Sequence, residues 1–245
     1  MNVYLCGQKY FGQEALKLLL ATRHRVVGVS APRVTRDGRP DRLWALAEDR
    51  GLPLLEAGKL KEETLPADVD LIIAAHSHDF IGRRTRLKAR IGAIGYHPSL
   101  LPLHRGRDAV RWVNKLRERI TGGTVYWLND TVDGGPIAAQ DWCFVGLDET
   151  AEELWQHKLQ PMGIRLFRQV LADIERGVLV QVPQERELAT WEPALDQPPL
   201  YRPDLLMLGN GYIEGFTVVR ERGALGGAPP RSSNDVPDDA YLAAV

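Results

Sequence analysis

The sequence contains few cysteines, almost no net charge and no long apolar run. Its 245 residues include two cysteines, Cys6 and Cys143, which are too few for a disulfide framework and fit a reducing compartment. The 31 Lys and Arg balance 32 Asp and Glu, so the chain lacks the basic excess that carries most nucleic-acid affinity. Residues 1–20 contain no basic leader and no unbroken apolar span. We therefore expect a cytoplasmic globular protein with no nucleic-acid and no membrane partner.

Glycine-rich phosphate-binding fingerprints are missing as well. Gly7 and Gly12 have the outer spacing of a P-loop, but Gln13 and Glu14 stand where that loop needs Lys and Ser or Thr. Lys9 stands two residues after Gly7, where a dinucleotide-binding turn needs a second glycine. The sequence therefore disfavours NAD and ATP as ligands.

Short apolar runs alternate with helical patterns over residues 1–180. The first pair is the run 3–6, followed by apolar residues at helical spacing within 11–19. Further strands are expected at 25–30, 70–75, 91–96, 123–128 and 137–145. Further helices are expected at 43–49, 83–90, 109–119 and 149–175, the last of them interrupted near Pro161. This alternation predicts an α/β fold in which helices cover both faces of a mostly parallel sheet.

The composition shifts toward proline after residue 180. We expect residues 1–180 to form the main domain and residues 181–245 to form a short Pro-rich appendage of strands and turns. Residues 222–239 are rich in Gly, Pro, Ser and Asp, which predicts a mobile segment. Apolar residues within 200–216 predict either a homodimer surface or a cover for the sheet.

Two histidines follow the expected strand 70–75. His76 and His78 would lie on one side of that strand if it continued, so a metal site has to be weighed. A hydrolytic zinc site needs at least three ligands, and no third histidine lies nearby at strand or helical spacing. We expect a polar pocket without a metal, and a metallohydrolase is the alternative.

The stretch 96–106, YHPSLLPLHRG, carries the clearest chemical signal. Two prolines restrict a loop that leaves a strand, and such a loop can hold the imidazole of His97 at the carboxyl edge of a sheet. Asp133 lies in a glycine-rich turn and could face His97. An imidazole and a carboxylate form the usual pair for acid/base work, and core hydrogen bonding is the alternative role for both.

The HPSLLP stretch and the RG that follows it resemble the folate-dependent formyltransferase family. That family includes the methionyl-tRNA, glycinamide-ribonucleotide and aminosugar enzymes and the hydrolase domain of formyltetrahydrofolate dehydrogenase. The likeness extends over about residues 1–180 and includes DGGPI at 133–137, and the separation of 36 residues between His97 and Asp133 matches the family. The resemblance implies a Rossmann-like catalytic domain in which His97 and Asp133 are the catalytic pair.

The resemblance also implies the substrates. The formyl donor would be 10-formyltetrahydrofolate, with no metal, and the acceptor a small amine such as an aminosugar nucleotide or an amino-acid derivative. A short chain after residue 180 and a neutral charge disfavour a tRNA acceptor. The donor pocket maps onto two loops and their ends, namely His78, Phe80, Ile81, Leu128, Asn129, Asp130 and Asp133.

Gly95 departs from the family pattern. The family usually has Asn at this position, two residues before the histidine, and glycine has no side chain to bind the formyl oxygen. Such a donor is commonly worth about 2.7–4 kcal/mol, and Asn129, His76, Ser77 or His78 could replace it. Two alternatives follow: a hydrolase that releases formate from the same donor, and a catalytically silent folate-binding homologue.

Overall fold

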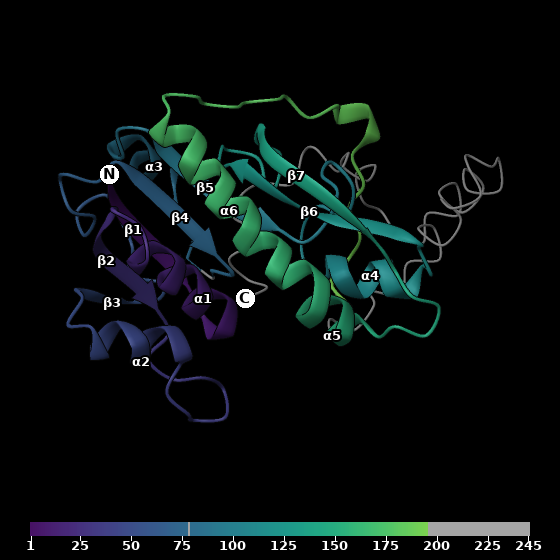
Figure 1. Ribbon diagram of the computed structural model, residues 1–245, viewed down its shortest axis with the longest axis horizontal. Coiled ribbons are helices and arrows are strands. Elements are labelled where there is room, and N and C mark those ends of the chain that lie inside the picture. The colour runs from purple at the N-terminus through teal and green to yellow at the C-terminus, as the bar shows by residue number, and fades with distance from the viewer. Residues whose placement is uncertain (78, 196–245) are drawn as a thin grey trace, which may run out of the picture. The chain divides into compact units, whose positions relative to one another are not determined.

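The computed structural model describes residues 1–77 and 79–195 (Figure 1). His78, the apolar stretch 200–216 and the mobile segment expected at 222–239 lie outside the described residues. Residues Met1–Glu192 belong to one compact unit. Within the described part of the chain, no helix is both long and apolar enough to cross a bilayer. The domain boundary at residue 180 stays a prediction.

A seven-stranded sheet forms the centre of the fold. Its strand order is β3-β2-β1-β4-β5-β6-β7. The strands are β1 (Asn2–Gly7), β2 (Arg25–Ala31), β3 (Leu54–Glu56), β4 (Leu71–Ala75), β5 (Gly92–His97), β6 (Ile120–Trp127) and β7 (Ile137–Phe144). The first five strands pair in parallel, whereas β6 runs antiparallel to β5 and forms a hairpin with β7. The prediction of a mostly parallel α/β sheet is confirmed.

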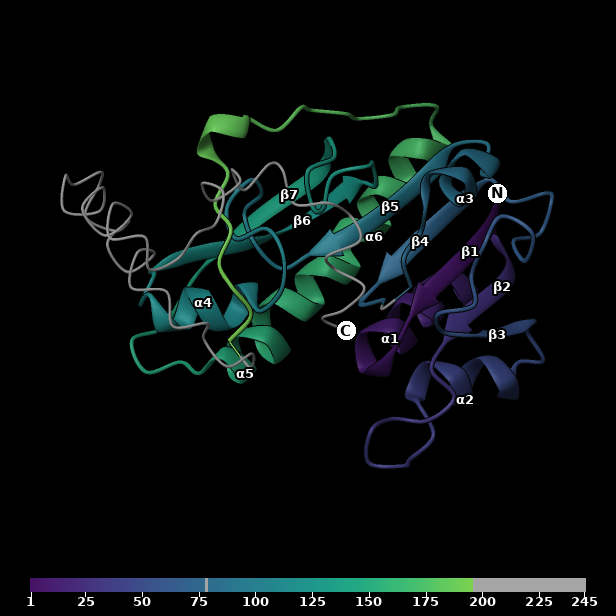
Figure 2. The ribbon, with the colours of Figure 1, turned by 180° about the vertical axis from the view of Figure 1, so that it is seen from behind.

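Helices cover both faces of this sheet, and α6 crosses one face while α3 lies on the other (Figures 1 and 2). The helices are α1 (Lys9–Leu20), α2 (Arg42–Asp49), α3 (Arg83–Lys88), α4 (Ala109–Lys115), α5 (Ala151–Leu154) and α6 (Gln160–Glu175). Side chains of β1 alternate between two cores, because successive strand residues point to opposite faces. Val3 and Leu5 join α1, α2 and α6, whereas Tyr4 and Cys6 pack with residues of the 60–69 segment and around α3.

The expected interruption near Pro161 is a π-helical turn, Trp155–Leu159, between α5 and α6. Proline has no N–H to close a helical bond, so the regular ladder is broken at this point. The Tyr96 hydroxyl of β5 donates to the Leu159 carbonyl at 2.6 Å. After α6, Gly177 adopts a φ of 79°, the left-handed conformation that commonly ends a helix.

Candidate active site

The loop after β5 is fixed by hydrogen bonds to β6. Thr124 Oγ1 donates to the Ser99 carbonyl at 2.7 Å and accepts from the Leu101 amide at 3.2 Å. The Ser99 hydroxyl closes the loop by donating to the Leu103 carbonyl at 2.6 Å. Since His97 is the last residue of β5, this loop starts at the carboxyl end of the parallel strands, where open α/β sheets place their ligands.

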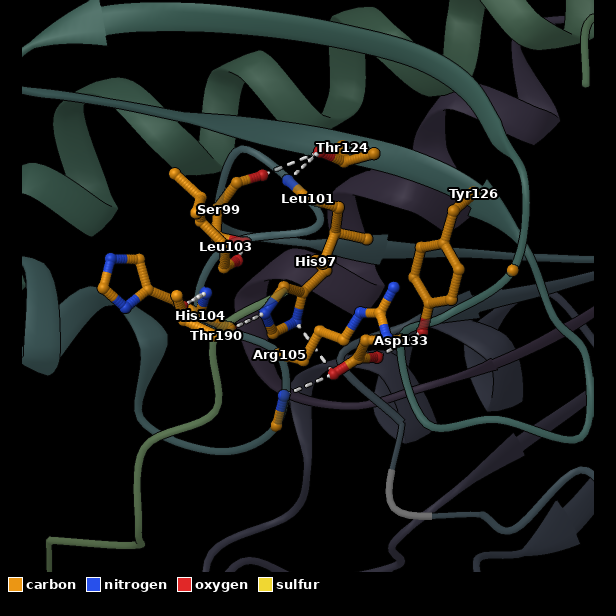
Figure 3. Close-up of polar contacts among 12 residues, drawn as sticks. His97, Ser99, Leu101, Leu103, His104, Arg105, Thr124, Tyr126, Asp133 and Thr190 are labelled. Carbon is orange, nitrogen blue, oxygen red and sulfur yellow. Dashed lines mark hydrogen bonds and ion pairs between the residues drawn. The ribbon is translucent and has the colours of Figure 1, made fainter. Parts of the chain in front are cut away.

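His97 lies between the loop backbone and Asp133, as Figure 3 shows. Its Nε2 is 2.6 Å from the His104 carbonyl oxygen, and its Nδ1 is 3.5 Å from Asp133 Oδ2. A carbonyl oxygen only accepts, so Nε2 carries the hydrogen of that bond. Nδ1, on the side of the carboxylate, is therefore the nitrogen at which the ring gains or loses a proton.

Asp133 is held by two donors on its two carboxylate oxygens. Oδ1 accepts from the Tyr126 hydroxyl at 2.6 Å, and Oδ2 accepts from the Gly106 amide at 2.7 Å (Figure 3). The residue lies between β6 and β7 with a φ of 47°, in the left-handed region. The structure thus brings together the two residues that the sequence assigned to catalysis, with His97 Nδ1 3.5 Å from Asp133 Oδ2.

The buried Arg105 and the half-buried Gln184 connect the loop after β5 to the turn that carries Asp133. The Arg105 guanidinium donates to Gln184 Oε1 through Nε at 3.2 Å and Nη2 at 2.7 Å. Gln184 Nε2 donates to the carbonyls of Asp133 and Gly135, at 2.8 and 2.7 Å. Burial lowers the pKa of Arg105, and the nearby carboxylate of Asp133 opposes this effect. One amide side chain therefore connects the arginine of the first loop to the turn that carries Asp133.

The segment after α6 runs along the loop that follows His97. The Thr190 hydroxyl accepts from the His104 amide at 2.7 Å, and the Thr190 carbonyl accepts from the Arg105 amide at 3.0 Å. The Thr190 amide donates to the Pro102 carbonyl at 3.2 Å. The sequence analysis missed Gln184 and Thr190, because nothing in a proline-rich stretch indicates which distant loop it contacts.

The His104 side chain points away from His97, as Figure 3 shows. It contacts two carboxylates, those of Glu118 and Glu192. Nε2 hydrogen-bonds Glu118 Oε1 at 3.0 Å, and Nδ1 lies 3.0 Å from Glu192 Oε1, at an angle outside hydrogen-bond geometry. Burial of the ring disfavours its charged form, but the combined attraction of Glu192 and Glu118 raises the pKa of His104. The ring thus joins the loop, the α4–β6 connection and the segment after α6.

Of the residues expected to form the donor pocket, those that the structure describes lie on the loop after β4 and on the loop after β6. Arg86 connects them, because its Nη1 donates to the Ile81 carbonyl at 2.7 Å and its Nη2 donates to Asp130 Oδ1. Asn129 Oδ1 accepts from the Thr131 amide at 2.8 Å. The exposed and half-buried side chains are Phe80, Asn129, Asp130 and Leu128, whereas the Ile81 side chain is buried in the second core.

The alternative metal site has little support among the residues described. His76 has a φ of 57°, and its ring contacts the Trp155 ring edge-on with centroids 6.0 Å apart. In residues 1–77 and 79–195, no group of three or more His, Cys, Asp and Glu side chains has an arrangement that could hold a metal ion. His76 therefore adjoins an aromatic side chain of the π-helical turn.

Comparison with known proteins places these observations in one family. Residues 47–171 match the family model described as formyl transferase. The chain is 34% identical over 203 residues to the mitochondrial 10-formyltetrahydrofolate dehydrogenase of Mus musculus, covering 78% of this chain and 22% of the relative. It is 31% identical over 202 residues to the methionyl-tRNA formyltransferase of Anaeromyxobacter dehalogenans, covering 78% of this chain and 64% of that enzyme. The chain thus spans about a fifth of the length of the dehydrogenases that it matches.

Solved structures of other formyltransferases share the fold of this chain. A solved structure of an N-formyltransferase from Helicobacter canadensis, in complex with folinic acid and dTDP-3-aminofucose, superimposes with a TM-score of 0.65. The sequence identity is 16%, and the match covers 78% of this chain and 70% of that one. A glycinamide ribonucleotide transformylase from Symbiobacterium toebii gives a TM-score of 0.60 at 18% identity, over 76% of this chain and 94% of that one.

Proposed function

The chain belongs to the formyl transferase family, and from this premise we propose that it transfers the formyl group of 10-formyltetrahydrofolate to a small amine. The single observation that carries the proposal is the placement of His97 Nδ1 3.5 Å from Asp133 Oδ2, at the carboxyl end of β5. Both residues lie within the part of the chain that matches the family model. An imidazole and a carboxylate this close together, at the carboxyl end of a parallel strand, can move the protons that acyl transfer requires.

In this mechanism, the acceptor nitrogen attacks the formyl carbon, a new C–N bond forms, and the bond from that carbon to the folate nitrogen breaks. The acceptor loses a proton and the folate nitrogen gains one. His97 holds or releases a proton at Nδ1, since its Nε2 remains bonded to the His104 carbonyl. Asp133 stabilises the imidazolium that forms when Nδ1 takes up the proton, and the buried Arg105 lies behind it.

The donor pocket proposed here fits the two loops joined by Arg86. A flat heterocycle needs apolar walls together with a few fixed donors and acceptors, and two loops held together by an arginine can supply both. Leu128 and Phe80 offer apolar surface, and Asn129 and Asp130 offer polar groups on the same two loops. Because the relative from Helicobacter canadensis holds folinic acid, we assign these two loops to the folate of the donor.

A second candidate is hydrolysis of the same donor, with water in place of the amine. The similarity to the 10-formyltetrahydrofolate dehydrogenases over 78% of this chain favours it, and so does the absence of a side chain at Gly95. The two activities differ only in what occupies the acceptor position. A cytoplasmic location, a homodimer and a small-molecule acceptor remain predictions, as does the catalytic domain at residues 1–180.

The test is the release of tetrahydrofolate from 10-formyltetrahydrofolate, followed by absorbance with and without a panel of small amines. We expect amine-dependent turnover that falls by about 10²–10⁴-fold in His97→Ala and in Asp133→Ala. The exposed residues His157 and Asp49 provide control variants, His157→Ala and Asp49→Ala, which should keep full activity.

The other outcomes separate the candidates. Turnover without amine, lost in both catalytic variants, identifies the hydrolase. Saturable folate binding without turnover identifies a silent homologue, and absence of folate binding overturns the proposal.

A further inference from the structure

Tyr126 lies on β6 directly opposite Gly95 of the neighbouring strand β5. Tyr126 is buried, with 7% of its surface exposed, and it lies one residue before the end of β6. A Cβ atom added at Gly95 would lie 3.0 Å from Leu128 Cδ2, 3.4 Å from Tyr126 Cε1 and 3.5 Å from Tyr126 Cζ. The tyrosine ring and the Leu128 side chain therefore border the space that a side chain at position 95 would enter.

The hydroxyl of this ring reaches Asp133. It donates to Oδ1 at 2.6 Å, which leaves Oδ2 to accept from the Gly106 amide at 2.7 Å and to face His97 Nδ1 at 3.5 Å. A carboxylate can rotate about its terminal bond, and that torsion has broad preferences. Two donors on opposite oxygens fix the rotation, so the orientation of Oδ2 toward His97 depends on both of them.

We propose that Tyr126 is a positioning residue of the active site, whose phenol fixes the Asp133 carboxylate so that one oxygen faces His97. The kinetic consequence rests on the proposed formyl transfer, whereas the coupling of the three side chains does not. Among residues 1–77 and 79–195, the charged or titratable groups that face the carboxylate are His97 from β5 and Arg105 from the following loop. In that part of the chain, the phenol donates the hydrogen bond that Oδ1 accepts, and no second donor to this oxygen is present.

The central experiment is a double-mutant cycle on the full chain. Tyr126→Phe removes the hydroxyl and keeps the ring, and we expect kcat to fall about 10- to 100-fold with the donor KM changed less than about twofold. In an Asp133→Asn background, the same change should lower kcat by less than about twofold, because the group on which Tyr126 acts has already been altered. A merely structural role predicts equal effects in both backgrounds, and that result overturns the proposal.

Tyr96→Phe is the matched control. Tyr96 is also a buried strand tyrosine whose hydroxyl donates to an acceptor at 2.6 Å, but its acceptor is the Leu159 carbonyl in the core. We expect this variant to lose stability while keeping kcat within about twofold. If both tyrosine variants lower kcat equally, the loss reports general loosening and Tyr126 has no special role.

A final measurement does not depend on turnover. The ring-nitrogen NMR signals of His97 should shift in Tyr126→Phe and stay in place in Tyr96→Phe, with both variants shown to be folded by circular dichroism. If the wild type shows no formyl turnover but His97 responds in this way, the proposed function fails and the coupling stands. If turnover is present and His97 does not respond, the function stands and the coupling fails.

Discussion

Two residues next to His97 adopt backbone conformations that few side chains tolerate. Asp133 has a φ of 47° and His104 a φ of 53°. A non-glycine residue in this region costs about 1–3 kcal/mol and persists only where the surrounding structure fixes it. Here the surrounding structure is visible: the Asp133 carbonyl is bonded to Gln184, and the His104 amide to Thr190. Strain on both sides of one imidazole supports a functional role for the loop.

Gly135 explains the shape of the turn that carries Asp133. A Cβ atom at this position would lie 1.7 Å from the Trp127 carbonyl oxygen, a backbone atom that cannot move without displacing β6. We predict that Gly135→Ala lowers the free energy of unfolding by about 2–3 kcal/mol or more, because a clash with backbone has no easy relaxation. Urea denaturation followed by fluorescence measures this change.

Gly82→Ala is the control for that prediction. Gly82 has an ordinary φ of −59°, and an added Cβ would meet only the Phe80 ring, at 3.4 Å. Its substitution should change stability by less than about 0.5–1 kcal/mol. Equal effects of the two substitutions would show that the close approach of Gly135 to Trp127 does not constrain the turn.

At the scale of elements, the long periodic segments could be predicted from the sequence. The strands expected at 25–30, 70–75 and 91–96 match β2, β4 and β5 to within one residue at each end. Their apolar runs are too short for helices, and this short length favours strands. β3 was missed, since Leu54–Glu56 is three residues long and its place in the sheet comes from pairing with β2.

The site could be predicted only where a local motif marks it. His97 and Asp133 stand in such motifs, and their roles stay a prediction that the geometry supports. Tyr126 gave no such signal, because a tyrosine in a strand is ordinary until its partner across the sheet is known to be a glycine. Gln184 and Thr190 act through contacts at long separations in the chain, which a single sequence does not encode locally.

Arg86 allows a prediction about the two loops of the proposed donor pocket. Its side chain is 11% exposed and bonds the Ile81 carbonyl and Asp130, so it fixes one loop to the other. Arg86→Met keeps the apolar stem but removes these bonds. We expect the donor KM to rise about tenfold, equivalent to about 1.4 kcal/mol, with kcat nearly unchanged because the catalytic pair is untouched.

The neighbouring Arg83 provides the control. Its side chain is 74% exposed and lies 3.8 Å from the same aspartate, which makes it a surface pair of little energetic value. Steady-state kinetics of Arg83→Met should agree with the wild type to within about twofold. A large fall in kcat for Arg86→Met would instead place this arginine in the chemical step.

For the whole molecule, His104 links stability to pH. Its pKa is raised, so the folded state binds this proton more tightly than the unfolded state does. The resulting stability is present in full below about pH 6.5 and is lost as pH rises through the raised pKa. His24 has the opposite effect on stability. Burial lowers its pKa, so the stability that depends on its neutral form is lost as pH falls.

The two effects can be separated by comparing His104→Gln with the wild type. Since His24 is present in both, its contribution cancels in the difference. We predict that the free energy of unfolding of the wild type exceeds that of the variant most below about pH 6.5, and that this excess shrinks as pH rises through the raised pKa of His104. Denaturant titrations at several pH values measure it, and an excess that grows with pH would contradict the assignment of a protonated His104 between Glu118 and Glu192.

The hydrogen bonds of Gln184 to Arg105 and Asp133 can form only late during synthesis of the chain. Gln184 leaves the ribosome 51 residues after Asp133. At ordinary elongation rates this interval lasts about 3–10 s. During this interval, the nascent chain contains His97 and Asp133 but lacks Gln184. The Gln184 side-chain amide is the group that joins Arg105 to the turn that carries Asp133. A chain released early in that interval would therefore display the complete family motif and still lack a finished site, which makes formation of the site a late event in the life of each molecule.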